Sequence, residues 1–346
     1  MPPLPPPSHA LPRRHAIQVL AALAAASAAA RGPAAWAAAD ASLEPAECIA
    51  PSRPGGGFDL TCGLATQAVQ AVRPTRPPLH TRYLPGGIGA MAFDQIATGR
   101  LGGPGTLVAF SSGSLLNIAQ GRFGPHPVSA VRWLATLGTD YGVVAVHRDS
   151  PHQRLQDVVA ALRKDSARVV FGAGGTLGSQ DWMKAALLTR AAGQDPKRMR
   201  FVSFEGGGEA LKALRGGHVD LFTGDAAEAQ QAVDKGAPLR FLAVLAQARL
   251  PGALAHLPTA SEQGVDLVWP TVRGLYMAAS APDAAVRAWA TALAEALAAP
   301  GYAALCSQYG LYPFARTGAA LEDFVQRSLA DYRQLAQELG LRSWPR

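Results

Sequence analysis

The chain has 346 residues, of which 49% are hydrophobic, and its 32 Lys and Arg against 25 Asp and Glu give a formal net charge of +7. The basic residues are scattered and no basic run is interleaved with aromatic residues, so the composition argues against a nucleic-acid-binding protein. The length is sufficient for two α/β domains after a leader segment.

Residues 1–39 have the pattern of a secretory signal peptide. They contain three arginines but no acidic residue, an alanine-rich apolar stretch over 16–30 that is too short to span a bilayer, and small residues at 37–39. We therefore expect export out of the cytoplasm and a mature chain with a formal charge of +4. The basic pair Arg13 and Arg14 leaves open whether the general or the twin-arginine route is used.

A glycine loop follows the first strand-like run, which ends near Cys48. Three successive glycines at 55–57 allow a sharp turn and a close approach of backbone N–H groups to a ligand. A helical run follows directly, with apolar residues on one face, so its positive end points back into the loop. Such a loop suits an anion. A glycine-rich turn without a ligand is the equally plausible interpretation of this loop taken alone.

The same order of strand-like run, small-residue loop and helical run occurs six times along the chain. The later five strand-like runs cover 80–84, 106–110, 169–171, 200–204 and 219–223. In open α/β sheets the carboxyl ends of the strands border the ligand crevice, so these loops should gather on one edge that is rich in backbone donors. The pattern predicts an α/β fold.

The remaining segments predict further strands and a helical C-terminal part. Strand-like runs cover 142–147 and 240–245, while 257–264 is expected to be a surface loop with a short helix and 269–278 to lead back toward the first domain. Residues 282–340 are expected to be mostly helical, and their aromatic residues to belong to the core rather than to a ligand site.

The cysteines predict one disulfide. Cys48 should end the first strand and Cys62 should lie in the first turn of the following helix, close enough to be bridged in an oxidising compartment. We expect a Cys48–Cys62 disulfide that fixes the glycine loop, with two free core cysteines as the alternative. Cys306 is expected to be a buried, unpaired thiol.

Motifs for several enzyme classes are absent from the sequence. There is no Walker loop, no complete Gly-x-Gly-x-x-Gly after a strand, no Gly-x-Ser-x-Gly and no His-Glu-x-x-His. The eight histidines are dispersed without metal-ligand spacing, so no metal, cofactor or catalytic residue is expected. Serines 111, 112, 114 and 179 have no evident histidine partner.

Five polar residues beside the glycine loops have two possible roles. Asp59 and Asp225 can cap a helix or orient a ligand or water, and Thr176 and Ser179 can cap a helix or bind a carboxylate. Arg273 can form a paired contact with a ligand carboxylate, or equally a surface or interdomain salt bridge.

Five segments together resemble the receptors of the tripartite tricarboxylate transporters, also called Bug proteins. They are Ile49-Ala-Pro-Ser-Arg-Pro-Gly-Gly-Gly-Phe-Asp59, Tyr83-Leu-Pro-Gly-Gly-Ile-Gly-Ala90, Val170-Phe-Gly-Ala-Gly-Gly-Thr-Leu-Gly-Ser179, Gly216-Gly-His-Val-Asp220 and Leu257-Pro-Thr-Ala-Ser-Glu-Gln-Gly264. The paired cysteines and Trp269-Pro-Thr-Val-Arg-Gly274 resemble the tricarboxylate (TctC) branch in particular.

The resemblance implies a non-enzymatic periplasmic receptor with a type II-like periplasmic binding protein fold, in which two α/β lobes joined by a hinge enclose the ligand cleft. One lobe would comprise 40–141 and 266–346, and the other 142–265. The ligand would be citrate or another tri- or dicarboxylate, and the partners would be the large and small membrane subunits of the carrier, with the receptor itself a monomer. The ligand-binding residues expected from the glycine-loop and Arg273 arguments and from the resemblance are Gly56, Gly57, Phe58, Asp59, Gly87, Ser112, Gly175, Thr176, Ser179, Asp225 and Arg273. At the second loop the acidic or amide residues of relatives are not obvious, and Phe58 replaces a smaller residue.

Two other functions remain compatible with the sequence. A periplasmic carboxylate sensor that feeds a two-component system would use the same binding chemistry. An exported α/β hydrolase would require a nucleophile and a base on the loop edge, and turnover of a model ester would reveal it.

Overall fold

The computed structural model describes residues 45–341. The predicted signal peptide lies outside these residues. Within the described part of the chain, no helix is both long enough and apolar enough to cross a membrane.

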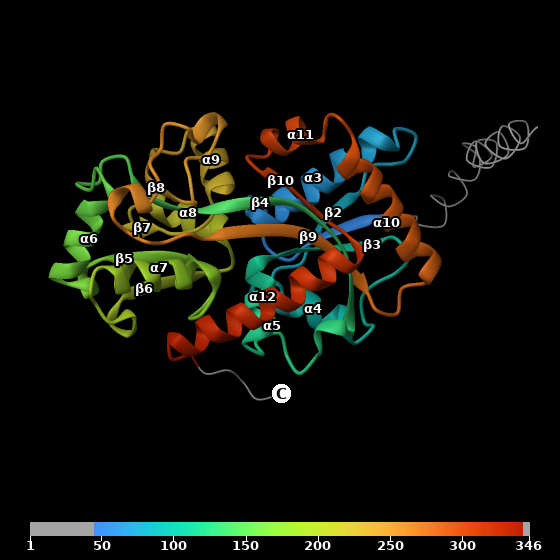
Figure 1. Ribbon diagram of the computed structural model, residues 1–346, viewed down its shortest axis with the longest axis horizontal. Helices are drawn as coiled ribbons and strands as arrows, with labels where there is room; N and C mark the ends of the chain where they lie inside the picture. Colours follow the sequence, from blue (N-terminus) through green and yellow to red (C-terminus); the bar gives the residue numbers. More distant parts are fainter. Residues whose placement is uncertain (1–44, 342–346) are drawn as a thin grey trace, which may run out of the picture. The chain divides into compact units, whose positions relative to one another are not determined.

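Ten strands and ten α-helices, labelled as in Figure 1, make up the described chain. The strands are β1 (Glu47–Ala50), β2 (His80–Tyr83), β3 (Thr106–Ser111), β4 (Val131–His147), β5 (Val170–Gly174), β6 (Arg200–Phe204), β7 (Leu221–Phe222), β8 (Leu239–Leu245), β9 (Pro270–Ala278) and β10 (Tyr312–Arg316). The helices are α3 (Gly57–Val72), α4 (Ala90–Ala97), α5 (Ser112–Ala119), α6 (Leu155–Lys164), α7 (Gln180–Ala191), α8 (Gly207–Arg215), α9 (Ala226–Asp234), α10 (Asp283–Ala298), α11 (Tyr302–Gln308) and α12 (Gly318–Glu338).

The strands form two groups that share the long strand β4. The order is β2-β1-β3-β9-β4-β7-β5-β6, with β8 and β10 also pairing with β4. Residues of β4 up to Tyr141 pair with β9, and from Gly142 onward β4 pairs with β8. Pairs β1–β2, β1–β3, β5–β6 and β5–β7 are parallel, as expected for strand–helix–strand units. The fold is therefore α/β with two lobes, as predicted.

We call β1–β3 with α3–α5 and α10–α12 the first lobe, and β5–β8 with α6–α9 the second lobe. Strands β4 and β9 run from one to the other (Figure 1). The predicted limits of the lobes, 141/142 and 265/266, remain a prediction. The change of partner along β4 at Gly142 is the observation that supports the first of them.

All six predicted strand–loop–helix units are confirmed, and the differences lie elsewhere. Only the end of β4 was expected as a strand, whereas β4 begins at Val131. Its earlier half contains small and polar residues, and the pairing with β9 on one side and β10 on the other makes it a strand. Strand β10 likewise interrupts the segment expected to be mostly helical. Strand β10 forms because it pairs with β4, and the local sequence pattern does not predict such a tertiary contact. The short helix expected within 257–264 is a 3₁₀ turn, Ser261–Gln263.

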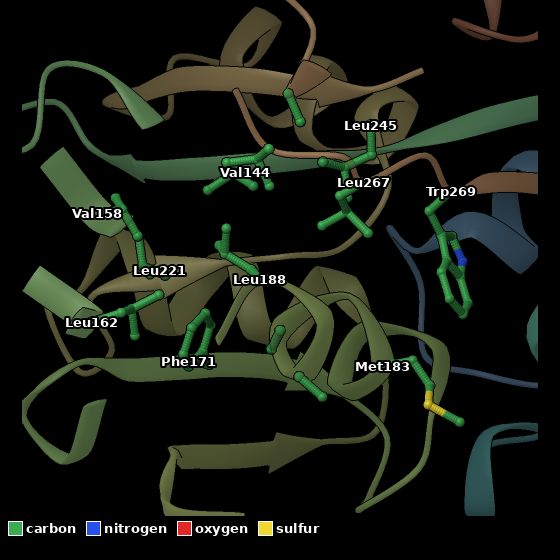
Figure 2. Packing of buried hydrophobic residues seen from close by; sticks show 14 of the residues in the cluster. Val144, Val158, Leu162, Phe171, Met183, Leu188, Leu221, Leu245, Leu267 and Trp269 are labelled. Atoms are coloured by element: carbon green, nitrogen blue, oxygen red, sulfur yellow. The ribbon is translucent and has the colours of Figure 1, made fainter. Parts of the chain in front are cut away.

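Each lobe has its own hydrophobic core. In the second lobe, residues of α6, α7 and β5 such as Val158, Leu188 and Phe171 pack beneath β4 (Figure 2). Trp269 lies at the edge of this cluster and stacks on Tyr332 of α12 at 6.3 Å between ring centroids. Because Tyr332 packs against the cores of both lobes, α12 fastens them together on one side.

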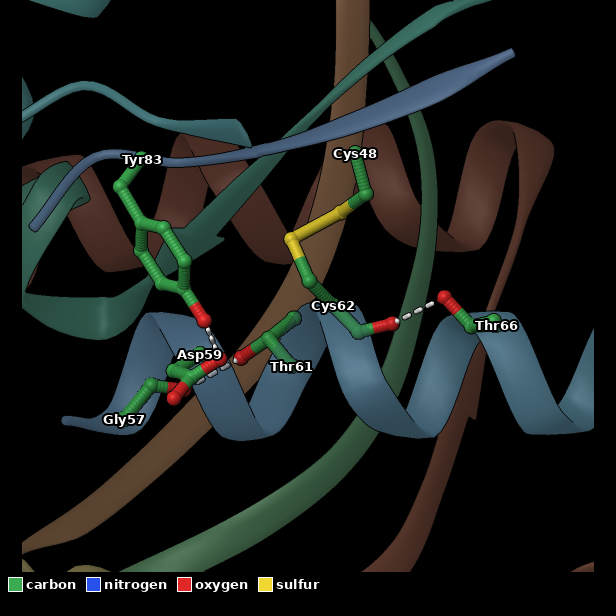
Figure 3. Close-up of a disulfide and its surroundings, with 7 residues drawn as sticks. All are labelled: Cys48, Gly57, Asp59, Thr61, Cys62, Thr66 and Tyr83. Atoms are coloured by element: carbon green, nitrogen blue, oxygen red, sulfur yellow. Dashed lines mark hydrogen bonds between the residues drawn. A yellow bond between two sulfur atoms is a disulfide. The ribbon is translucent and has the colours of Figure 1, made fainter. Parts of the chain in front are cut away.

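The Cys48–Cys62 disulfide is confirmed. It joins the second residue of β1 to the second turn of α3, with 5.6 Å between the two Cα atoms (Figure 3). Cys48 does not end the strand and Cys62 lies beyond the first helical turn, so both expected positions were off by a few residues. Cys306 is free and buried, as expected. The disulfide therefore fixes α3 relative to the strand that precedes the first glycine loop.

Candidate functional site

Five helices begin at one small cavity between the lobes. The first residues of α3 and α5 reach it from the first lobe, and those of α7, α8 and α9 reach it from the second. We call this cavity, of about 40 Å³, the inner compartment. It is lined by Ser52, Gly56, Gly57, Phe58, Ile88, Ser111, Gly113, Asn117, Gly174, Ser179, Gln180, Asp181, Gly206, Gly207, Asp225, Glu228 and Arg273. Because the first N–H groups of a helix lack intrahelical partners, this wall is rich in backbone donors.

Two of these helices have no side-chain cap. The N-cap residues of α3 and α8 are Gly56 and Gly206, and no side chain among residues 45–341 bonds to the free amides at either helix start. By contrast, α5 and α7 are capped by the hydroxyls of Ser111 and Ser179. The starts of α3 and α8 therefore offer backbone N–H groups from both lobes to a ligand.

A larger cavity of about 580 Å³ adjoins the inner compartment, and we call it the outer compartment. The two share Ile88, Asn117 and Ser179 in their linings. Ile88 has a φ of 51°, a strained conformation for a β-branched residue, and lies close to the backbone of Gly175 in the other lobe. The remaining lining residues of the outer compartment are Gly87, Ala90, Gly121, Arg122, Gly124, Gly175, Thr176, Ser203, Phe204 and Glu205.

The first glycine loop is fixed by Asp59. One carboxylate oxygen of Asp59 accepts a hydrogen bond from the amide of Gly55 at 2.8 Å. The other accepts one from the hydroxyl of Tyr83 at 2.8 Å, which ties the first loop to the end of β2 (Figure 3). Burial and the bond to Asp59 raise the pKa of Tyr83 to about 12.

Behind the inner compartment lies a network of buried charges. Arg273 donates from Nη2 to Asp140 at 2.8 Å and to Asp225 at 2.9 Å. Lys184 lies 2.8 Å from Asp225 and 3.0 Å from Asp181. Asp225 also accepts hydrogen bonds from Thr271 and Gln180, both at 3.0 Å. Asp140 and Arg273 come from β4 and β9, so the network lies where these strands pass from one lobe to the other.

The network neutralises its own cations. Burial opposes the charge on Lys184, but Asp181 and Asp225 raise the pKa of the ammonium above its ordinary value. Burial likewise opposes the charge on Arg273, yet Asp140 and Asp225 raise its pKa. Burial alone would raise the pKa of Asp225, but Lys184 and Arg273 hold it below the ordinary value. A ligand anion would therefore meet no uncompensated side-chain cation at this end of the cleft.

Glu228 is a buried carboxyl group at the meeting point of the two uncapped helix starts. A Cβ built on Gly207 would overlap this carboxyl, and one built on Gly56 would lie 3.6 Å from Oε2. Oε1 accepts a long hydrogen bond of 3.4 Å from the amide of Asp225. Burial, with the nearby charges of Asp225 and Asp181, raises the pKa of Glu228 from 4.5 to about 8. At neutral pH the group is therefore mainly protonated and can donate a hydrogen bond.

Glu228→Gln should change how stability depends on pH. The folded protein holds the Glu228 proton up to about pH 8, whereas the unfolded chain releases it near pH 4.5. Wild-type stability therefore contains a component that falls as pH rises between these values, by up to about 1.4 kcal/mol per pH unit. Glutamine lacks this component. In urea unfolding at pH 5, 6, 7 and 8, the free energy of unfolding of the variant relative to that of the wild type should therefore increase at each step.

Glu262→Gln is the matched control. The Thr259 amide and Arg249 lower the pKa of Glu262, so it is ionised in both the folded and unfolded states above pH 5. Its replacement should shift stability by the same amount at every pH tested. Parallel curves for the wild type and Glu228→Gln would contradict a buried, protonated Glu228.

The structure brings most of the predicted ligand-binding residues together. Gly56, Gly57, Phe58, Ser179, Asp225 and Arg273 line the inner compartment, and Gly87, Gly175, Thr176 and Ser179 line the outer one. Asp59 and Ser112 lie outside both linings. Asp59 holds the first loop, and the hydroxyl of Ser112 accepts a hydrogen bond from the Val272 amide at 2.9 Å. That these residues bind the ligand remains a prediction.

Sequence reasoning missed several residues of the site. Glu228 and Lys184 lie within helical runs and Asp140 just before a strand-like run, and only the fold brings them to Arg273. Arg122, in the outer compartment, follows α5 without any motif. The only signal in the sequence for Glu228 was its position three residues after Asp225, which is the spacing of a helix-capping pair.

A further hollow of about 690 Å³ lies at the far end of β4, near His147, Lys164 and Asp220. None of the predicted ligand-binding residues lines it. Within residues 45–341, no group of three or more His, Cys, Asp or Glu side chains is placed to hold a metal ion.

Comparison with known proteins gives a family match over most of the chain. Residues 87–341 match the family described as tripartite tricarboxylate transporter family receptor. A protein of Cupriavidus necator, named UPF0065 protein in gbd 5'region, is 22% identical over 216 residues, which are 62% of this chain. The match spans 64% of the length of that curated relative.

Solved structures share the fold. The periplasmic binding protein BugD is 17% identical, with a TM-score of 0.76 over 86% of this chain and 98% of that protein. A MatC protein of Rhodopseudomonas palustris with bound malate is 20% identical, with a TM-score of 0.70 over 84% and 98%. An R. palustris protein with adipate is 19% identical, with a TM-score of 0.75 over 86% and 97%. At these identities the likeness establishes the two-lobed fold.

Proposed function

Because this chain belongs to the tripartite tricarboxylate transporter receptor family, we propose that it is a periplasmic receptor that captures a small carboxylate, such as citrate or another tri- or dicarboxylate, and delivers it to the membrane subunits of a carrier. The receptor acts as a monomer and without catalysis. The observation that carries the proposal is the convergence of five helix starts, two of them without side-chain caps, on one cavity between the lobes.

Backbone N–H groups bind one carboxylate of the ligand. The amides at the starts of α3 and α8 face the inner compartment from opposite lobes, and the positive ends of both helices favour an anion there. Glu228, when protonated, adds a donor from the second lobe. Since Arg273 and Lys184 are matched by carboxylates, their role is to hold this wall in place.

Lobe closure completes the site. Strands β4 and β9 connect the lobes, and a hinge there lets the second lobe move toward the first. Closure removes water from the cleft and strengthens each hydrogen bond to the ligand. The ligand shifts the equilibrium toward the closed form, which the carrier recognises. MatC with malate and the R. palustris protein with adipate support a carboxylate as the ligand.

Isothermal titration of the mature protein tests the proposal. The panel contains citrate, other tricarboxylates, short dicarboxylates, monocarboxylates and acidic amino acids. We expect saturable binding of at least one carboxylate at micromolar or tighter affinity, with the ligand recovered unchanged. The protein is first unfolded and refolded to remove any co-purified ligand. Absence of binding by every carboxylate, from refolded protein with native circular dichroism, would refute the proposal.

A further inference from the structure

Arg122 is a half-buried cation in the outer compartment, and all its partners are neutral. Its Nε donates to the Gln120 side chain at 3.1 Å, and its Nη1 donates to the Thr176 hydroxyl at 3.0 Å. None of the ion pairs found within residues 45–341 includes it. Burial lowers the pKa of the Arg122 guanidinium, with no carboxylate to offset this effect. A guanidinium in this position favours an anion within reach.

Contacts between the lobes hold Arg122 in place. Gln120, which is fully buried, donates to the carbonyl of Gly178 in the second lobe at 2.8 Å. The side-chain oxygen of Gln120 accepts a hydrogen bond from Arg122. Thr176, the other side-chain partner of Arg122, also belongs to the second lobe. The guanidinium is thus held where the two lobes meet, in the lining of the outer compartment.

Among the described residues, the inner compartment has no cation available to pair with a second carboxylate of the ligand. Arg273, which lines it, and Lys184, which lies behind it, are each paired with two buried aspartates. Its volume of about 40 Å³ leaves space for only one small group in this arrangement. Any second anionic group of a ligand held there must extend into the outer compartment, where Arg122 lies.

Glu205 limits how many anionic groups the outer compartment accepts. It lines this compartment, and its Oε2 is buried without a hydrogen-bond partner in the described chain. A carboxylate beside this oxygen would be repelled, whereas a hydroxyl or amine would supply the missing hydrogen bond. The outer compartment therefore has one cation for one carboxylate and an acceptor that disfavours another.

We propose that Arg122 is the specificity-determining residue of the cleft and selects dicarboxylates: one carboxylate lies on the backbone donors of the inner compartment and the second on the Arg122 guanidinium. This inference rests on the proposed carboxylate-binding function and narrows it. Ligands with a single carboxylate lose the contact with Arg122, and tricarboxylates place a third charge near Glu205.

Titration with matched ligand pairs tests the inference. Succinate, glutarate and adipate are each compared with their monomethyl esters, which keep the length but lose one charge. For the best diacid, the wild type should bind the diacid at least ten times more tightly than the ester and more tightly than citrate. Arg122→Gln should weaken diacid binding by about 10- to 100-fold, the range for a charge-assisted hydrogen bond, and leave ester binding within about threefold.

Two further variants separate charge, geometry and fold. Arg122→Lys keeps the charge and should retain part of the preference for the diacid. Arg327→Gln removes the same charge from an exposed ion pair with Asp323 on α12 and should leave both affinities unchanged. If Arg122→Gln does not fold, the diacid and ester affinities of the wild type and of Arg122→Lys still show whether Arg122 determines the preference for the diacid.

Each failure has a distinct cause. If the wild type binds no carboxylate, the proposed function fails and this inference fails with it. If the wild type binds carboxylates but Arg122→Gln weakens diacid and ester equally, Arg122 only holds the lobes together and the specificity inference is overturned while the receptor function stands. A wild-type preference for esters or for citrate over every diacid would also overturn it.

Discussion

Arg273→Met should lower the free energy of unfolding by about 3–5 kcal/mol, the usual cost of removing one partner of a buried ion pair. Methionine fills a similar volume but leaves Asp140 and Asp225 without their shared cation. Both carboxylates are almost fully buried, so water cannot replace the guanidinium. Urea unfolding of the ligand-free protein at pH 7 measures the loss.

The loss should depend on pH. Burial, partly opposed by Arg273, already raises the pKa of Asp140 to about 6 in the wild type, and removal of the cation would raise it further. A carboxyl whose pKa is raised on folding destabilises the protein as pH rises above its unfolded value, near 3.8. The destabilisation of Arg273→Met should therefore be smaller at pH 5 than at pH 7.

Two comparisons isolate the cause. Arg132→Met makes the same substitution in an exposed pair with Asp283 and should cost only a small fraction of what Arg273→Met costs, because water solvates both charged groups. Adding Asp140→Asn to Arg273→Met should recover part of the lost stability, because it removes the carboxylate that is left without a cation, whereas Asp225 keeps Lys184. If Arg273→Met costs no more than Arg132→Met, the buried network does not hold the two lobes as described.

The fold could be predicted from the sequence because its units are local. Each strand, glycine loop and helix start is encoded within about 25 residues, as the run from Cys48 through the glycines to α3 shows, and these six units account for most of the cleft wall. The bridge between Cys48 and Cys62 was predictable for the same reason, since one such unit contains both. Strand β10 was not, because only its pairing with β4 makes it a strand.

The site could be predicted only in its backbone part. Glycines 56, 57 and 175 mark the loops in sequence and do line the compartments. The side-chain chemistry depends on pairs far apart in the chain. The sequence left Arg273 open between a ligand contact and a salt bridge, and the fold decides for the salt bridge by placing Asp140 and Asp225 against it, 133 and 48 residues away. Whether a buried arginine is available to a ligand depends on its neighbours, which a motif does not contain.

Gly57→Ala should weaken carboxylate binding by about 100-fold or more. A Cβ at this position would overlap the Arg273 guanidinium, which Asp140 and Asp225 hold from behind. The start of α3 must therefore retract, and its free amides leave the inner compartment. A displacement of about 1 Å is enough to lose hydrogen bonds worth this factor. Titration with the best ligand of the wild type measures the loss, after circular dichroism has shown that the variant is folded.

The neighbouring glycine supplies the control, because the two positions differ only in what a methyl group would meet. At Gly56 the backbone φ is −107°, which alanine adopts freely, and a Cβ would meet no atom closer than 3.6 Å. Gly56→Ala should therefore bind within about tenfold of the wild type, a difference of about 1.4 kcal/mol. Equal, complete loss in both variants would mean that any side chain on the loop blocks the ligand directly, and the contact with Arg273 would not be the cause. Unchanged binding by Gly57→Ala would remove the start of α3 from the site, and the carboxylate would then have to lie on α8 and the outer compartment alone.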